Sequence, residues 1–262
     1  MNEIRRLAED NRQKSTLLLD RKRPVPEKRD RPISPAKFEA NEDDFENLVE
    51  FTLKTIEEIA IKYKTKAEGK AKIIKTEDIV LDLRVRWKCI IPTCFGYGVT
   101  AHCPPNSPTY EQMKEIVSAY KFGLFYRYSP LVNRNVFPLF PTEGGQIANE
   151  TNEITSRVEA EAGYMGYYLA MGFKGGPCAL CGMFSPQILA DWTLGKEIPR
   201  CDVLEGKMCA QFLKARPALE ACSVDVFATA KKIGWESPYV IMPEHSEKSV
   251  PNANWFGLIL LV

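Results

Sequence analysis

Eight cysteines are the side chains with the clearest chemistry in this 262-residue sequence, and seven of them fall into two groups. The first group is Cys89, Cys94 and Cys103; the second is Cys178, Cys181, Cys201 and Cys209; Cys222 follows alone. We expect all of them in loops or at helix ends, among glycines and prolines. Only two histidines, His102 and His245, accompany them, so a bound metal would be held by thiolates.

This setting is typical of an iron–sulfur site. A cluster needs three or four thiolates around one inorganic core, so the chain must turn sharply, which glycine permits. The second group supplies enough thiols for one [4Fe–4S] cluster. The first supplies three, and its fourth ligand would be Cys222, another residue or a group from outside the protein. Lys207, Lys214 and Arg216 are placed to offset the negative charge of a cluster near Cys209.

Zinc is the main alternative, because Cys178-x2-Cys181 with two further cysteines would complete a closed tetrahedral site. Zinc ribbons usually carry two such tight pairs, however, and this chain has one. A thioredoxin-like pair would need a βαβ setting that the flanking sequence does not offer. Buried, unreactive thiols explain one cysteine easily, with Cys222 the best case, and eight poorly.

The composition excludes several classes of protein. Hydrophobic residues make up 45% and charged residues 26%, which is ordinary for a globular protein. The net charge of +1 argues against a broadly basic surface for nucleic acid. We expect no membrane span, because no apolar run approaches about 18 residues. The charged start carries no secretory segment, so we predict a cytoplasmic protein in which disulfides are disfavoured.

The elements that must position the cysteines can be predicted from periodicity. Residues 1–40 are expected to form a flexible, charged, proline-containing arm, and residues 41–262 a single domain with an inserted flap at about 183–200. Helical periodicity predicts helices over 41–63, 109–120, 147–171 and 223–233. Strands are predicted at 78–88, 122–128, 239–242 and 255–262. The predicted fold class is α+β: a small, mainly antiparallel sheet packed with helices, with cysteine-bearing loops that hold metal clusters.

Four polar residues near the cysteines are interpreted as structural. His102 is predicted to be a loop histidine with an ordinary hydrogen bond. Asp225 is predicted to cap the helix at 223–233. Arg216 is expected to pair with Glu220 or to contact sulfide.

Three ordered motifs resemble those of a bacterial and archaeal family of predicted metal-binding proteins. They are Cys89…Cys94…Tyr97-Gly98…Cys103-Pro104-Pro105, then Gly176-Pro177-Cys178-Ala179-Leu180-Cys181, then Cys209…Lys214-Ala215-Arg216-Pro217…Val224-Asp225-Val226. The resemblance covers about residues 84–262 and implies iron–sulfur ligation, without implying an activity.

The chain departs from this family pattern in several places, of which two concern the cysteines. A long segment separates Cys181 from Cys201. Cys222-Ser223 stands where a residue other than cysteine, followed by glycine, is usual, so Cys222 is a candidate for a ligand added in this chain.

We therefore predict an iron–sulfur protein with two [4Fe–4S] sites, an electron-transfer or redox subunit of anaerobic metabolism. Cys178, Cys181, Cys201 and Cys209 would hold one cluster, and Cys89, Cys94, Cys103 and Cys222 the other. A redox partner protein or larger complex would dock on the arm and the flap; homo-oligomerisation stays open. One alternative is an oxidoreductase or lyase that uses an open iron at Cys89, Cys94 and Cys103. The other is a structural zinc module.

Overall fold

The computed structural model describes residues 33–130, 145–182, 186–197, 199–236, 239 and 254–262. The chain divides into two units, residues 1–34 and residues 35–262, and every element named below lies in the second. Most of the predicted arm, and residues 240–242 of the strand predicted at 239–242, lie outside the described residues. Tyr239 is described and is not in a strand.

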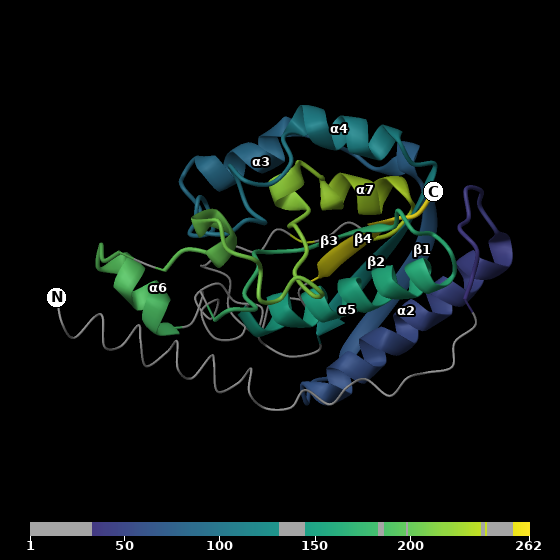
Figure 1. Ribbon diagram of the computed structural model, residues 1–262, viewed down its shortest axis with the longest axis horizontal. Coiled ribbons are helices and arrows are strands. Elements are labelled where there is room, and N and C mark those ends of the chain that lie inside the picture. Colours follow the sequence, from purple (N-terminus) through teal and green to yellow (C-terminus); the bar gives the residue numbers. More distant parts are fainter. Residues whose placement is uncertain (1–32, 131–144, 183–185, 198, 237–238, 240–253) are drawn as a thin grey trace. The chain divides into compact units, whose positions relative to one another are not determined.

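A four-stranded antiparallel sheet forms the centre of the second unit, with strand order β1-β2-β4-β3 (Figure 1). The strands are β1 (Ala67–Lys75), β2 (Phe122–Pro130), β3 (Met171–Lys174) and β4 (Trp255–Leu260). The two central strands, β2 and β4, are buried along almost their whole length. They confirm the strands predicted at 122–128 and 255–262.

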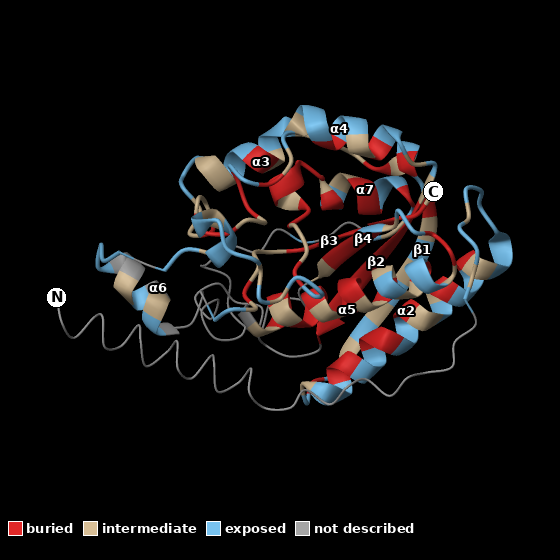
Figure 2. Cartoon of the chain, viewed as in Figure 1, coloured by how far each residue is buried: buried red, intermediate tan, exposed pale blue. Residues whose placement is uncertain are grey.

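Helices cover both faces of the sheet (Figures 1 and 2). One face packs against α2 (Glu42–Lys62) and α5 (Gly145–Tyr164). The other face packs against α4 (Tyr110–Ser118) and α7 (Val226–Lys232). The fold is therefore α+β, as the sequence predicts.

Helix α2 follows the predicted periodicity. Asn41 caps it by accepting a hydrogen bond from the backbone N–H of Asp44 at 2.9 Å, which satisfies one of the free donors of the first turn. Phe45, Leu48 and Ile56 are buried on one face, at the three- and four-residue spacing of an amphipathic helix.

Strand β1 was not predicted, and its small residues explain why. A Cβ atom added at Gly69 would lie 3.0 Å from Cδ1 of Ile56, so α2 packs directly on the backbone of β1. Ala67 and Ala71 share the partly buried side of the strand, while lysines occupy exposed positions. The close packing of α2 thus requires glycine and alanine in β1, and these small residues do not give the apolar alternation by which a strand is predicted.

The strand predicted at 78–88 is wrong, because helix α3 (Leu83–Ile90) occupies most of it. Asp82 caps the helix by accepting from the backbone N–H of Arg84 at 2.8 Å. Only Leu81 forms an isolated bridge, antiparallel to Val224. The buried residue of α3 is Arg86, so the inward face of the helix is marked by a charged side chain and not by apolar periodicity.

The helix predicted at 147–171 ends earlier than expected, at Tyr164, and residues 171–174 form strand β3. Gly166 adopts φ +109°, and a Cβ atom there would lie 2.3 Å from the carbonyl oxygen of Pro35. The backbone N–H of Lys37 also donates to the carbonyl of Gly166 at 2.9 Å. The close approach of Pro35 and Lys37 thus requires glycine at 166, two residues after the helix ends, and Gly172 lies within strand β3.

The segment predicted as a flap contains α6 (Pro186–Thr193). Among the residues the structure describes, no helix is long and apolar enough to cross a membrane.

Gly257→Ala should destabilise the protein by about 2 kcal/mol, because overpacked cores typically cost 1–3 kcal/mol. The new Cβ atom would lie 2.1 Å from Cε1 of buried Tyr126, so the ring must move. The matched control is Gly163→Ala on α5, where a Cβ atom meets nothing within 4 Å. It should stabilise the helix by about 0.5 kcal/mol. Urea denaturation measures both variants, and equal midpoints for the two would contradict the packing described at Gly257.

Candidate metal centre

Three separate segments carry the first cysteine group. Cys89 lies in the last turn of α3, Cys94 in the turn that follows, and Cys103 in the loop before α4. The fourth thiol, Cys222, ends the short 3-10 helix η4 (Glu220–Cys222), which packs against α3. This contact brings Cys222 toward the helix that carries Cys89, more than a hundred residues earlier in the sequence.

The thiols of this group are close enough for the charge of one to be felt by another. Burial, together with the charges of Cys94 and Cys103, raises the pKa of Cys89 to about 12. Burial also raises the pKa of Cys222 to about 12, with Glu220, Cys103 and Cys89 adding to the effect and Arg86 opposing it. Cys222 therefore interacts electrostatically with Cys103 and Cys89 of the first group.

The second group collects around the loop that leaves β3. Cys178 and Cys181 follow that strand, Cys201 precedes the 3-10 helix η3 (Asp202–Glu205), and Cys209 lies in the next loop. Burial raises the pKa of Cys181 to about 11, and the charges of Cys178, Cys209 and Cys201 contribute. Despite the long segment before it, Cys201 interacts electrostatically with Cys178 and Cys181.

Hydrogen bonds to sulfur are present in both groups. The backbone N–H of Gly96 donates to Cys94 and lowers its pKa against a larger rise from burial, and the N–H of Leu180 does the same for Cys178. The hydroxyl of Thr100 acts likewise on Cys103. A Cβ atom at Gly96 would lie 3.1 Å from Sγ of Cys103. Donors aimed at sulfur, and backbone close against it, fit thiolate ligands of an iron–sulfur cluster.

The described thiols do not form a preassembled site for a single metal ion. In the described part of the chain, no three histidine, cysteine or acidic side chains converge tightly enough to hold a single metal ion. A [4Fe–4S] cluster makes a different demand, because each iron takes its own thiolate and the ligands surround a core several atoms wide.

Arg86 joins the segments that carry the first group. Its guanidinium is buried and donates to Oγ of Ser107 at 2.7 Å and to the carbonyls of Pro108, at 2.8 Å, and Ala221. Helix α3, the loop after Cys103 and the turn before Cys222 are thereby tied to one side chain. Because neutral oxygens accept its hydrogen bonds, the charge also acts on nearby thiolates, and it lowers the pKa values of Cys89 and Cys222 against the rise from burial.

Two further charged residues lie beside the cysteines: Lys174, which is buried, and Glu220, which is partly buried. Nζ of Lys174 donates to the carbonyl of Gly176 at 2.8 Å and to that of Pro177, directly before Cys178. The carboxylate of Glu220 accepts from the backbone N–H of Gly176 at 3.2 Å. Sequence reasoning missed Arg86 and Lys174, because each lies inside a regular element, where a charged residue usually faces solvent.

Two of the three cations predicted to offset a cluster, Arg216 and Lys207, pair with carboxylates instead. Arg216 forms a two-point ion pair with Glu159, with both N–O distances 2.7 Å, so the pairing with Glu220 predicted as one of its two roles is wrong. Lys207 pairs with Glu205 at 2.5 Å and with Asp202 at 3.6 Å. Arg216 instead holds the chain after Cys209 against α5.

The remaining polar predictions have mixed outcomes. Asp225 caps α7, accepting from the N–H groups of Phe227 and Ala228, as predicted. Burial, aided by the charges of Lys174 and Arg216, lowers the pKa of His102 to about 4, so its ring is neutral at pH 7. Ser223, where glycine is usual in the resembled family, adopts φ +67°, a conformation that favours glycine.

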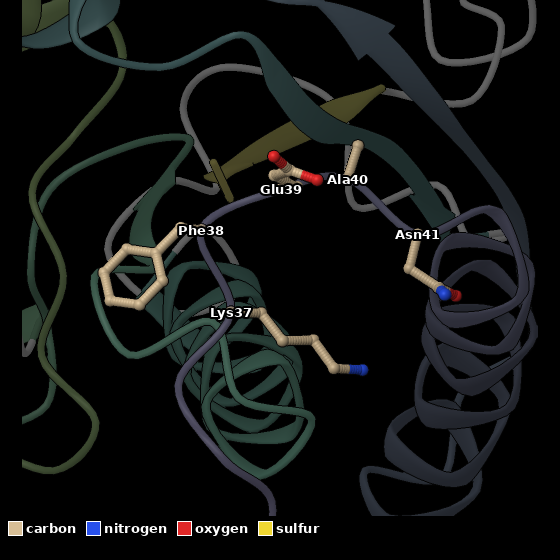
Figure 3. Close-up of a pocket in the computed structure, with 5 residues that line it drawn as sticks. All are labelled: Lys37, Phe38, Glu39, Ala40 and Asn41. Carbon is tan, nitrogen blue, oxygen red and sulfur yellow. The ribbon is translucent and has the colours of Figure 1, made fainter.

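A pocket lies apart from this chemistry, along the segment before α2 (Figure 3). Its lining residues are Lys37, Phe38, Glu39, Ala40 and Asn41. None of these five is a cysteine, and Lys37 pairs with Asp44.

Comparison with known proteins gives one match. The family described as predicted metal-binding protein (DUF2284) matches residues 72–261, a span that contains all eight cysteines. Searches of curated proteins and of solved structures found no match.

Arg86→Met should lower the free energy of unfolding of the metal-free protein by about 3 kcal/mol, because several buried acceptors lose their donor. It should also weaken metal binding by the first group. Urea denaturation gives the first quantity and metal content the second. The matched control is Arg84→Met, whose side chain is 88% exposed and should leave the midpoint unchanged. A denaturation midpoint for Arg86→Met equal to that of the control would contradict the role of Arg86.

Cys89 should react slowly with iodoacetamide in the metal-free protein, although its side chain is only partly buried. A pKa of about 12 in place of 9.0 lowers the thiolate fraction at pH 8 by about a thousandfold. Because the pKa is raised, the thiolate fraction keeps growing with pH, and the reaction rate should increase up to about pH 12. Mass spectrometry of the modified peptide measures it, with protein unfolded in urea as the control. Equal rates at pH 8 in folded and unfolded protein would contradict the expectation.

Proposed function

The chain belongs to the family of predicted metal-binding proteins, and from this premise we propose that it is an iron–sulfur protein with two [4Fe–4S] sites. Cys178, Cys181, Cys201 and Cys209 would hold one cluster, and Cys89, Cys94, Cys103 and Cys222 the other. Such clusters supply one-electron redox chemistry. The proposed role is that of an electron-transfer or redox subunit in anaerobic metabolism.

The observation that carries the proposal is the electrostatic interaction among thiols within each group. The charges of Cys103 and Cys89 act on Cys222, and those of Cys209 and Cys201 act on Cys178 and Cys181. Four thiolates per site is the ligand set of a [4Fe–4S] cluster. The N–H and O–H groups directed at Cys94, Cys103 and Cys178 support the same cofactor, since hydrogen bonds to sulfur are one of the means by which proteins set cluster potentials.

The position of Cys222 bears on the enzymatic alternative. That alternative requires an iron at Cys89, Cys94 and Cys103 that stays open to a substrate. Cys222 is fully buried on the turn held by Arg86, and its charge interacts with two of the three thiols. This placement supports a closed set of four ligands, and so favours electron transfer over catalysis at an open iron.

Exposed residues near the second group support the docking of a partner protein there. Cys181 is exposed. Met208, Phe212 and Leu213, on either side of Cys209, are exposed by 80%, 57% and 65%. An electron carrier needs a cluster near its surface and an apolar area around it for transient docking. We propose that a redox partner docks at this loop.

Single cysteine substitutions test the proposal in protein purified without oxygen. Cys103→Ser should lose one cluster and spare the other, and Cys201→Ser should do the reverse. Iron, sulfide and visible absorption would be measured together. Each variant should keep about half of the wild-type iron and sulfide, about four of each. Loss of all iron in either variant would contradict two separate sites, and zinc without sulfide would replace the proposal with a structural zinc module.

Cys222→Ser separates the closed site from the open one. If Cys222 is a ligand, the variant should lose or convert one cluster, and cyanide should leave the wild-type spectrum unchanged. The matched control is Ser223→Gly, which relieves a positive φ at the next residue and should be more stable by about 1 kcal/mol with both clusters retained. A Cys222→Ser variant that keeps both clusters, together with a wild-type spectrum that responds to cyanide, would favour the enzyme.

A further inference from the structure

Lys174 is the last residue of β3, four residues before Cys178. Its side chain is completely buried, which is rare for lysine unless negative charge lies nearby. Its backbone is fixed on both sides, by strand pairing with Gly257 and by a bridge with Ala218. The ammonium group is therefore held in a defined place.

Contacts of Lys174 lead to one cysteine of each group. Its ammonium group donates to the carbonyl of Pro177, directly before Cys178. Its backbone bridges Ala218, whose N–H donates to the carbonyl of His102, directly before Cys103, at 3.2 Å.

The charge of Lys174 also reaches these two thiols. It favours the thiolate of Cys178, in the second group, and that of Cys103, in the first. The reverse effect is also present: burial lowers the pKa of Lys174 to about 8, and Cys178, Cys103 and Glu220 act to raise it.

Gly176 connects Lys174 to the carboxylate of Glu220. Its carbonyl accepts from Nζ of Lys174 at 2.8 Å, and its N–H donates to Oε2 of Glu220 at 3.2 Å. The negative charge of Glu220 acts in turn on Cys89, Cys94, Cys103 and Cys222. The peptide groups of Gly176, just before Cys178, thus contact both Lys174 and Glu220, and the charge of Glu220 acts on thiols of the first group.

The loops of the two groups also touch. A Cβ atom at Gly96 would lie 3.1 Å from Sγ of Cys103 and 3.6 Å from Cβ of Pro177, the residue before Cys178. The backbone N–H of Cys201 donates to the carbonyl of Val99 at 2.9 Å. Val99 and Ala179 share a small buried cluster, with Cys201 packed against it. Protein atoms, and not solvent, occupy this contact, so charges on either side interact with little screening.

We propose that the two cysteine groups form one electrostatically coupled redox unit in which Lys174 is the shared positive charge. The inference rests on the proposed function. Each centre takes one electron from an external one-electron reductant such as dithionite, and no bond of the protein forms or breaks. An electron on one centre makes reduction of the other less favourable, and Lys174 makes reduction of both more favourable.

The first test replaces Lys174 with methionine, which is close in length but neutral. Both midpoint potentials of Lys174→Met should shift to more negative values than in the wild type, in titrations followed by visible absorption and electron paramagnetic resonance. The matched control is Lys70→Met, on an exposed side chain of β1, at the opposite edge of the sheet from β3, and it should leave both potentials unchanged. A shift of only one potential, or of neither, in Lys174→Met overturns the shared role of this residue.

The second test needs no change at Lys174, so it decides whether the two centres are coupled even if Lys174→Met does not fold or load. Cys201→Ser removes the second centre and its negative charge. The midpoint potential of the remaining centre should then become less negative than in the wild type. An unchanged potential overturns the coupling. If the purified protein contains no iron and sulfide, the proposed function is wrong. If both centres are loaded but their potentials are unchanged by both substitutions, only this inference is wrong.

Discussion

The buried guanidinium of Arg86 is the constraint on which the first cysteine group depends. A positive charge can be kept inside a protein only if its donors are paired, and Arg86 meets this condition with the hydroxyl of Ser107 and the carbonyls of Pro108 and Ala221. Each acceptor belongs to a segment that carries a cysteine or leads to one. Satisfying one side chain therefore fixes the positions of thiols that are far apart in sequence, and it leaves a charge that favours their ionised form.

The second group relies on the same principle at Lys174. Carbonyls of Gly176 and Pro177 accept from its ammonium group, and the charge acts on thiols of both groups. Metal-free thiols in this environment hold their protons, as the raised pKa values of Cys89 and Cys181 indicate. Binding of metal must release those protons, and the two buried cations reduce the cost of the resulting negative charge. The sheet and its helices supply the rigid frame for this arrangement.

Much of this could be predicted from the sequence, and the failures have physical causes. Periodicity revealed α2 and the central strands, and cysteine types with glycine-rich loops indicated thiolate sites. Strand β1 escaped prediction because close packing selects glycine and alanine there. Helix α3 differs from the predicted strand because its apolar and charged residues alternate and its buried side chain is the charged Arg86. The joining of Cys222 to the first group depends on tertiary contacts between η4 and α3, which no local pattern reveals.

The measurement that tests the central claim most directly is the content of iron, inorganic sulfide and zinc per chain, in protein purified without oxygen. Two closed sets of four thiolates predict about eight irons and about eight sulfides per chain, with visible absorption that bleaches on reduction. Stoichiometric zinc without sulfide, in colourless protein, would contradict the account.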